Sequence, residues 1–347
     1  MKTRTFFGLL TGLLLSSPVL PQDGGYEVPR TEWGQPDLQG VWNFSSDVPM
    51  QRPQRFGNRQ FLNEEEMEER RAQIASTRAA ADEAAAELVL DPEAPAATNN
   101  PGGYNDFWVE VAGLADVVRT SHIIHPEDGR IPEVVEGAPR QFGGLGPDIP
   151  GERPVRYVVG GIAKNGPEDR GLSERCIVGF NSGPPFVPSL YNNNMQIIQN
   201  EDTAVIMTEM VHDARIVPLV ERPPLHDDIR LWSGDSRGWW DGDTLVVETK
   251  NFTGLRQTFA STGTDYDMAL TERFTRTAFD TVQYEFTIND PSTFTDKITA
   301  VVPMIKVAGQ IYEYACHEGN YGMLNTLRGA RVDEQRLAQG EELPERH

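Results

Sequence analysis

The sequence predicts a mainly β fold, an antiparallel barrel or sandwich that can be calycin-like, with an N-terminal helical excursion. Two observations predict this class. From residue 155 onward, short runs rich in β-branched and aromatic residues follow one another, and no helical pattern separates them. Tight turns lie between the runs, and Asp241-Gly242 is a strong hairpin signal. Because no internal repeat or domain boundary is visible, we expect residues 23–347 to form a single β-rich domain.

The first 22 residues have the composition of a cleavable secretory signal peptide. Lys2 and Arg4 form a short basic region, residues 6–15 are apolar, and small residues follow. The apolar run is shorter than the roughly 20 residues needed to span a bilayer, and no other segment is long and apolar enough. We therefore expect an exported protein, periplasmic or secreted, without a stable membrane span. A short N-terminal membrane anchor is the alternative.

The most persuasive long helix spans residues 63 to about 90. Asn63 is a good N-cap, and Glu66 three residues later completes a capping-box pattern. The alanine-rich later part offers little apolar surface, so we expect this helix to lie on the surface. Residues 91–103 are rich in Pro, Ala, Asn and Gly and are expected to form a loop.

The predicted strands begin with Gly40-Val41-Trp42, which follows a turn and can close the sheet. The others lie in the second half of the chain, at 203–211, 237–240, 243–248, 271–277, 281–288, 297–304 and 310–314. Polar and apolar residues alternate in 271–277 and 281–288, which is typical of strands with one buried face.

The overall charge limits the class of partner. The formal net charge is −21. Such a surface repels phosphate backbones and anionic lipid, so we expect no nucleic-acid partner. It also disfavours polyanionic substrates, unless a local basic pocket overrides the overall field. No nucleotide-binding glycine motif is present, so we expect no nucleotide cofactor.

The chain has two cysteines, Cys176 and Cys316. In an oxidising compartment such a pair most simply forms one disulfide. Closing a loop of this length stabilises a protein by about 5 kcal/mol in the chain-entropy model. A reactive Cys316 beside His317 is the alternative.

Two segments concentrate groups that can move protons, and each ends a predicted strand. One contains His212 and Asp213, and the other contains His317 and Glu318. An imidazole gives or takes a proton at neutral pH, and a nearby carboxylate can fix its tautomer. Because adjacent residues of a strand point to opposite faces, we expect pairing across the segments, of His212 with Glu318 or of His317 with Asp213.

Other interpretations of these histidines stay open. Both can be structural, or His212, His317 and a carboxylate can form a three-ligand zinc site. No HExxH or CxxC motif supports zinc, so we predict no metal ligands and no cofactor.

A second group of residues indicates a ligand-binding surface for a small molecule or a saccharide. Amides, guanidinium groups and aromatic rings can together bind sugars or aromatic acids. The candidates are Asn192, Asn193, Asn194, Arg215, Arg237, Trp239 and Tyr321. The alternative is that the tryptophans belong to the core and the asparagines form a loop.

Three segments carry a resemblance to known proteins: HDARIVPL (212–219), GDSRGWWDGDTLVVETKNF (234–252) and YEYACHEGNYGM (312–323). They resemble a family of exported bacterial proteins whose members are mostly uncharacterised. The resemblance implies export and a coherent C-terminal half. It implies no activity.

Together these residues favour an exported, cofactor-free acid–base enzyme: a lyase, isomerase or hydrolase acting on a small or medium polar organic ligand. His212 and His317 would carry protons, Asp213 and Glu318 would orient them, and Arg215 or Arg237 would hold an anionic group. The ligand would lie in the mouth of the barrel or sandwich. A non-catalytic calycin-like binding protein is the first alternative, a zinc-dependent hydrolase the second, and a structural envelope protein the third.

Overall fold

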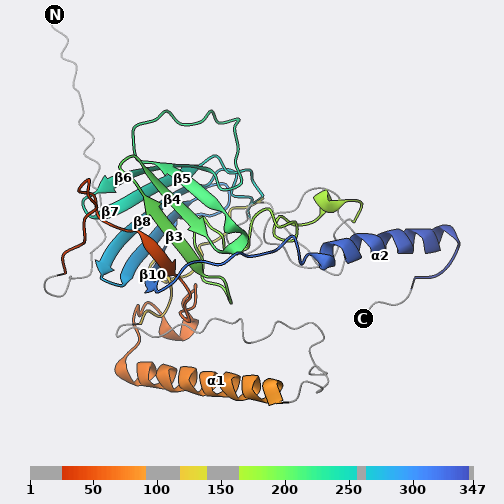
Figure 1. Ribbon diagram of the computed structural model, residues 1–347, viewed down its shortest axis with the longest axis horizontal. Coiled ribbons are helices and arrows are strands. Elements are labelled where there is room, and N and C mark those ends of the chain that lie inside the picture. Colours follow the sequence, from red (N-terminus) through yellow and green to blue (C-terminus); the bar gives the residue numbers. More distant parts are fainter. Residues whose placement is uncertain (1–25, 91–117, 139–163, 256–262, 344–347) are drawn as a thin grey trace, which may run out of the picture.

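A computed structural model describes residues 26–90, 118–138, 164–255 and 263–343 (Figure 1). The predicted signal peptide and the predicted loop 91–103 lie outside these residues. In the described chain, no helix is both long enough and apolar enough to cross a bilayer.

Ten strands form one antiparallel sheet, in the order β5-β4-β3-β1-β10-β9-β8-β7-β6, with β2 beside β10. Their bounds are β1 Gly40–Asn43, β2 Ile123–His125, β3 Asn194–Gln199, β4 Thr203–Thr208, β5 Ala214–Pro218, β6 Asp235–Asp241, β7 Thr244–Lys250, β8 Ala269–Ala278, β9 Thr281–Asn289 and β10 Ile298–Val307. The helices are α1 Glu64–Leu90 and α2 Tyr321–Ala338, and the short 3-10 turns are η1 Gln54–Phe56, η3 Pro167–Asp169 and η4 Met210–His212.

The N-terminal strand β1 joins the two halves of the sheet, because it pairs with β3 on one side and β10 on the other. Trp42 in this strand is fully buried. The predicted Asp-Gly hairpin is present between β6 and β7, where Asp241 pairs with Thr244. Buried and partly buried residues alternate along β8 and β9, as the sequence pattern predicts.

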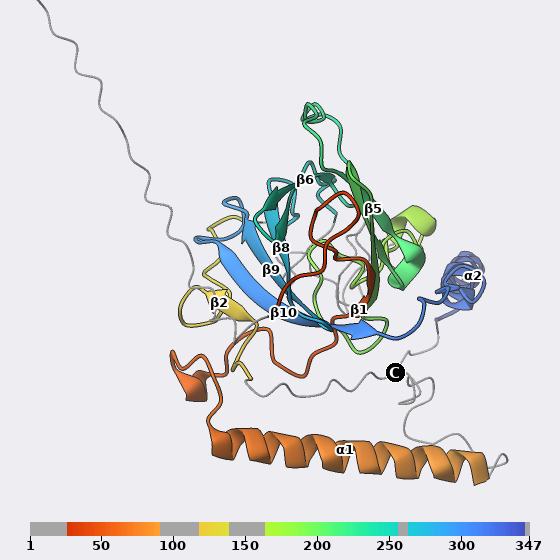
Figure 2. The ribbon, with the colours of Figure 1, turned by 60° about the vertical axis from the view of Figure 1, so that its left-hand side comes forward.

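The sheet curls around its own core, so that strands from both ends of the order face each other (Figure 2). The end strands β5 and β6 approach without pairing to each other. Gly238 of β6 permits this approach, because a Cβ atom there would lie 2.9 Å from Val217 Cγ1 and 2.8 Å from Leu219 Cδ2. The predicted fold class is confirmed: the protein is mainly β and sandwich-like. The sheet is not closed into a barrel.

Helix α1 runs along one side of the sheet and exposes most of its described residues (Figures 1 and 2). The capping box forms as the sequence predicts: Glu66 N donates to Asn63 Oδ1, and Asn63 N donates to Glu66 Oε2, both over 2.9 Å.

The sequence prediction is wrong in the C-terminal segment. Residues 310–314 are not a strand, because the Tyr312 amide donates to the Glu209 carboxylate instead of to a neighbouring strand. The next segment forms α2, which the sequence analysis did not predict. None of its residues is buried and two glycines interrupt it, so neither apolar periodicity nor propensity marks it clearly.

Candidate functional site

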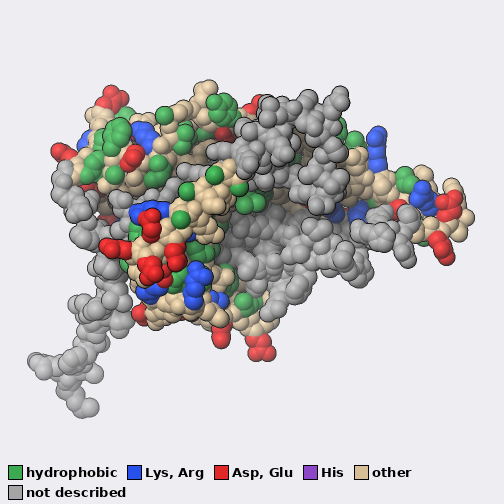
Figure 3. All heavy atoms as spheres, turned by 90° about the horizontal axis from the view of Figure 1, so that it is seen from below, with side chains coloured by type: hydrophobic (Ala, Val, Ile, Leu, Met, Phe, Trp, Pro, Cys, Tyr) green, Lys and Arg blue, Asp and Glu red, His purple; other side chains and the backbone are tan. Residues whose placement is uncertain are grey.

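A cavity of about 240 Å³ opens where residues 47–56, the start of α1 and residues 118–120 meet. We call it the arginine groove, because three guanidinium groups contribute to its lining. The lining residues are Asp47, Val48, Pro49, Pro53, Arg55, Phe56, Leu62, Arg70, Val118, Arg119 and Thr120. In the view from below, the first half of α1 faces the reader, and basic and acidic side chains lie together there (Figure 3).

The buried side chain of Arg52 ties the segments around the groove together. Its Nε donates to Thr120 Oγ1 over 3.0 Å, and its Nη1 donates to the Glu127 carbonyl over 2.7 Å. Gly129 has φ +69°, and a Cβ atom there would lie 2.8 Å from the Arg52 guanidinium. A larger residue at 129 would therefore displace Arg52 and loosen the groove.

Arg119 is a partly buried guanidinium of the groove. It lies over the Phe61 ring, 4.7 Å from the centroid, and forms no side-chain hydrogen bond or ion pair with the described residues. Burial lowers its pKa, and the neighbouring charge of Arg52 lowers it further against a smaller opposing effect of Glu285. A cation in these surroundings is stabilised when an anion approaches it.

The other two arginines lie on different walls. Arg55 is exposed and lies over the Phe56 ring at 4.7 Å. Arg70 Nη2 donates to the Asp47 carbonyl over 2.9 Å, and Nη1 donates to Gln73 Oε1 over 3.1 Å. The groove thus combines cationic groups with apolar walls, in a chain whose net charge is −21. This composition suits a small anion with an apolar body.

The predicted proton carriers lie elsewhere. His212 and His317 are both exposed. Asp213 Oδ2 accepts from Ser233 Oγ over 2.6 Å. Within the described chain, no side-chain hydrogen bond or ion pair links His212, Asp213, His317 and Glu318, so the expected cross pairing is not formed. None of the four lines the arginine groove.

The two histidine segments nevertheless meet, at Glu209. Its buried carboxylate accepts from Asn194 Nδ2 over 2.8 Å, from Asn192 Nδ2 over 3.3 Å and from Tyr312 N over 3.0 Å. Val211, just after Glu209, has φ +59°, which is rare for a β-branched residue. We call this arrangement the Glu209 junction.

The asparagines predicted to bind substrate make structural contacts. Asn192 and Asn194 hold Glu209, as described above. Asn193 is fully buried and bonds both backbone groups of Ser189, accepting from its amide over 2.8 Å and donating to its carbonyl over 2.9 Å. Their amides are therefore occupied by the protein itself.

The two arginines predicted to bind substrate are paired with carboxylates. Arg215 is buried inside the sheet and donates to both oxygens of Glu272, over 2.6 and 2.9 Å. Burial alone would lower the pKa of Arg215, but Glu272 outweighs it and raises that pKa. Arg237 donates to Asp235 Oδ2 over 2.7 Å and to the Arg222 carbonyl over 2.9 Å. The two predicted aromatic contacts, Trp239 and Tyr321, are exposed.

Aromatic residues and Glu272 surround Arg215 inside the sheet. Tyr284 OH donates to Glu272 Oε1 over 2.8 Å, and burial raises the Tyr284 pKa well above its usual value. The Phe186 ring lies 5.5 Å from the Tyr284 ring and 5.4 Å from the Arg215 guanidinium carbon. In this packing the Arg215 guanidinium is bound by Glu272.

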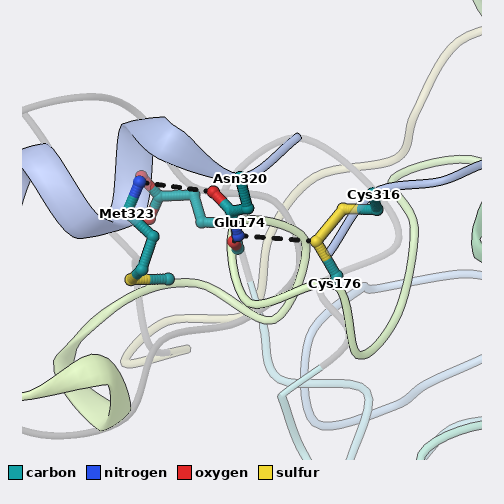
Figure 4. The surroundings of a disulfide bond; sticks show 5 residues. All are labelled: Glu174, Cys176, Cys316, Asn320 and Met323. Carbon is teal, nitrogen blue, oxygen red and sulfur yellow. Dashed lines mark hydrogen bonds between the residues drawn. A yellow bond between two sulfur atoms is a disulfide. The ribbon is translucent and has the colours of Figure 1, made fainter. Parts of the chain in front are cut away.

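The disulfide prediction is confirmed. Cys176 and Cys316 are joined, with Cα atoms 5.8 Å apart, which rules out a free reactive thiol at Cys316 (Figure 4). Asn320 supports the bond, donating through Nδ2 to the Glu174 carbonyl over 2.7 Å and to Cys176 Sγ over 3.5 Å. Its Oδ1 accepts from Met323 N and caps α2.

Sequence reasoning missed Glu272 and the arginine groove for different reasons. Glu272 occupies a buried position of an alternating strand, and a charge at such a position is a signal that could have found it. The groove arginines come from three separate segments, and no spacing relates them.

Comparisons with known proteins found no matching family model, curated protein or solved structure for this chain. Within the described ranges, no three His, Cys, Asp or Glu side chains are placed to hold one metal ion.

Proposed function

We propose that this chain is an exported, non-catalytic binding protein that holds a small organic anion in the arginine groove. The observation that carries the proposal is a cavity of about 240 Å³ lined by three arginines, two of which, Arg55 and Arg119, form no side-chain hydrogen bond with the described residues. The N-terminal leader composition and the disulfide support export, because disulfides persist in oxidising compartments.

In this proposal, binding depends on hydrogen bonds and apolar contacts between the ligand and the residues that line the groove. A guanidinium presents donors in a fixed fork that matches the two oxygens of a carboxylate. Val48, Phe56 and Leu62 offer apolar contact to the rest of the ligand. Ligand pockets usually measure about 300–1,000 Å³. The groove is slightly smaller, which suits a molecule of the size of a substituted benzoate.

The test compares benzoate with its neutral isostere benzamide by isothermal titration calorimetry. Benzoate is expected to bind saturably at one site, and benzamide at least tenfold more weakly. Hydrogen bonds to charged groups contribute about 1.5–3 kcal/mol, so Arg119→Gln is expected to weaken benzoate binding by roughly 10- to 100-fold. Arg55→Gln should weaken it less, since Arg55 is exposed.

Arg71→Gln is the matched control, because Arg71 follows Arg70 on α1, is exposed and does not line the groove. It is expected to bind benzoate like the unchanged protein. Equal affinity for benzoate and benzamide would refute the proposal. So would an equal loss of benzoate affinity in Arg71→Gln and Arg119→Gln. Thermal unfolding of each variant separates lost binding from lost folding.

A second candidate, the acid–base enzyme, is favoured by the Glu209 junction. The junction brings together the segments that carry His212 and His317. The disulfide and Asn320 fix the segment that carries His317. A rigid setting of this kind is what proton-transfer groups need. Here His212 and His317 would exchange protons with a polar ligand at the surface.

The enzyme proposal is tested with a metabolite mixture and mass spectrometry. The purified protein is expected to consume a polar substrate, and His317→Gln is expected to abolish that turnover without changing the melting temperature. His226→Gln is the control, because His226 is exposed in another loop. Full turnover by His317→Gln, or no consumption of any compound, contradicts this candidate.

A further inference from the structure

Asp47 carries an unused hydrogen-bond acceptor at the arginine groove. The residue lines the cavity, and its Oδ2 atom is buried without a hydrogen-bond partner in the described chain. A buried charged acceptor that lacks a donor destabilises a protein, and each such atom in a native structure calls for an explanation. The missing donor is therefore a clue to the ligand.

Two donors close to Asp47 in the chain, the Arg70 guanidinium and the Val48 amide, are used elsewhere. Arg70 Nη2 donates to the backbone carbonyl of Asp47, over 2.9 Å, and not to its carboxylate. The Val48 amide donates to Ser46 Oγ over 3.1 Å, and Ser46 Oγ is in turn bonded to His122 Nε2 over 2.9 Å. The donor for Asp47 Oδ2 has to come from outside this set.

We infer that the ligand of the groove is a hydroxycarboxylate, whose carboxylate lies against the arginines and whose hydroxyl donates to Asp47 Oδ2. The inference rests on the proposed binding function and names its ligand class. Two negative charges repel, so the carboxylate group itself cannot occupy the place beside Asp47. A neutral hydroxyl satisfies the acceptor without that repulsion.

An ammonium group is a poorer donor for this place. It would pair with Asp47, but Arg55, Arg70 and Arg119 line the same small cavity and would repel it. The apolar contacts of Phe56 and Leu62 further favour a ring or short hydrocarbon that separates hydroxyl from carboxylate. The hydroxybenzoates have this composition and serve as probes.

The experiment measures the affinities of benzoate, 3-hydroxybenzoate and 4-hydroxybenzoate for the full chain by calorimetry. At least one hydroxybenzoate is expected to bind about tenfold or more tightly than benzoate, because the bond to a charged acceptor is a strong one. In Asp47→Ala this preference should vanish, while benzoate binding stays equal or becomes tighter. Asp227→Ala, at an exposed position outside the groove, should keep the preference.

The outcomes separate the two proposals. If benzoate binds and neither hydroxyl improves its affinity, the inference about Asp47 is overturned and the proposed binding function stands. If the preference persists in Asp47→Ala, the hydroxyl has another partner and the inference is also wrong. If no compound binds at all, the proposed function itself fails. Should Asp47→Ala not fold, Asp47→Asn keeps the shape of the side chain and removes its charge.

Discussion

His122 is a buried histidine whose surroundings keep it neutral. Its Nδ1 bonds the Val301 carbonyl over 2.7 Å, and its Nε2 bonds Ser46 Oγ over 2.9 Å, which attaches the chain beside the groove to strand β10. Burial lowers the His122 pKa from 6.5 to about 4; the Val301 carbonyl opposes this, and Arg119 adds to it. The neutral ring is therefore part of the folded structure.

This lowered pKa predicts a pH dependence of stability. Between pH 6.5 and 4 the unfolded chain binds a proton at His122 that the folded chain does not, so stability falls as the pH falls through this window. The loss is about 3 kcal/mol, at 1.36 kcal/mol for each pH unit of the shift. Denaturant unfolding measured at several pH values from 4 to 7 gives the free energy of unfolding at each pH. This free energy should change less steeply with pH in His122→Gln than in the unchanged protein. Identical slopes for the two proteins would contradict the assignment.

At the residue scale, the sequence predicted contacts only where chemistry restricts the choice. Cys176 and Cys316 had one simple pairing. The partner of Arg215 was not predictable, because Glu272 lies 57 positions away and nothing local relates the two. The same holds for Arg55 and Arg119, which folding brings to one cavity.

Elements were predictable where the signal is local. The capping box at Asn63 and the hairpin at Asp241-Gly242 depend on a few neighbouring residues, and both formed. The segment 310–314 has a strand-like composition, but a distant carboxylate takes its backbone amide. Its conformation is thus fixed by tertiary contact, which a pattern of side chains does not reveal.

The close approach of strands β5 and β6 can be tested by a substitution at Gly238. Gly238→Ala places a Cβ atom against Val217 and Leu219 and should destabilise the protein by about 1–3 kcal/mol, as overpacking does. Gly329→Ala is the control, because nothing lies within 4 Å of that position and alanine favours the helix. Denaturation midpoints compare the two. An unchanged midpoint in Gly238→Ala would show that the end strands are not closely packed.

At the scale of the whole molecule, the disulfide fastens the C-terminal segment to the rest of the chain. It bridges 140 positions of sequence, and Asn320 and Arg331 add hydrogen bonds to residues 164, 165 and 174 nearby. Because no residue of α2 is buried, apolar packing does little to hold this helix. We therefore expect the covalent bond to dominate its attachment.

Removing the bond tests this expectation. In the chain-entropy model a loop of this length is worth about 5 kcal/mol. Cys316→Ser should lower the melting temperature and expose residues 308–320 to limited proteolysis, and reduction of the unchanged protein should do the same. Resistance to protease equal to that of the oxidised protein would mean that the noncovalent contacts suffice.

The proposed function requires an organic anion to bind among Arg55, Arg70 and Arg119. Crystals grown with 4-bromobenzoate would test it directly through the anomalous signal of bromine. We expect a bromine peak inside the arginine groove, with the carboxylate against Arg119. A peak found only elsewhere, with the groove empty at saturating ligand, would contradict it.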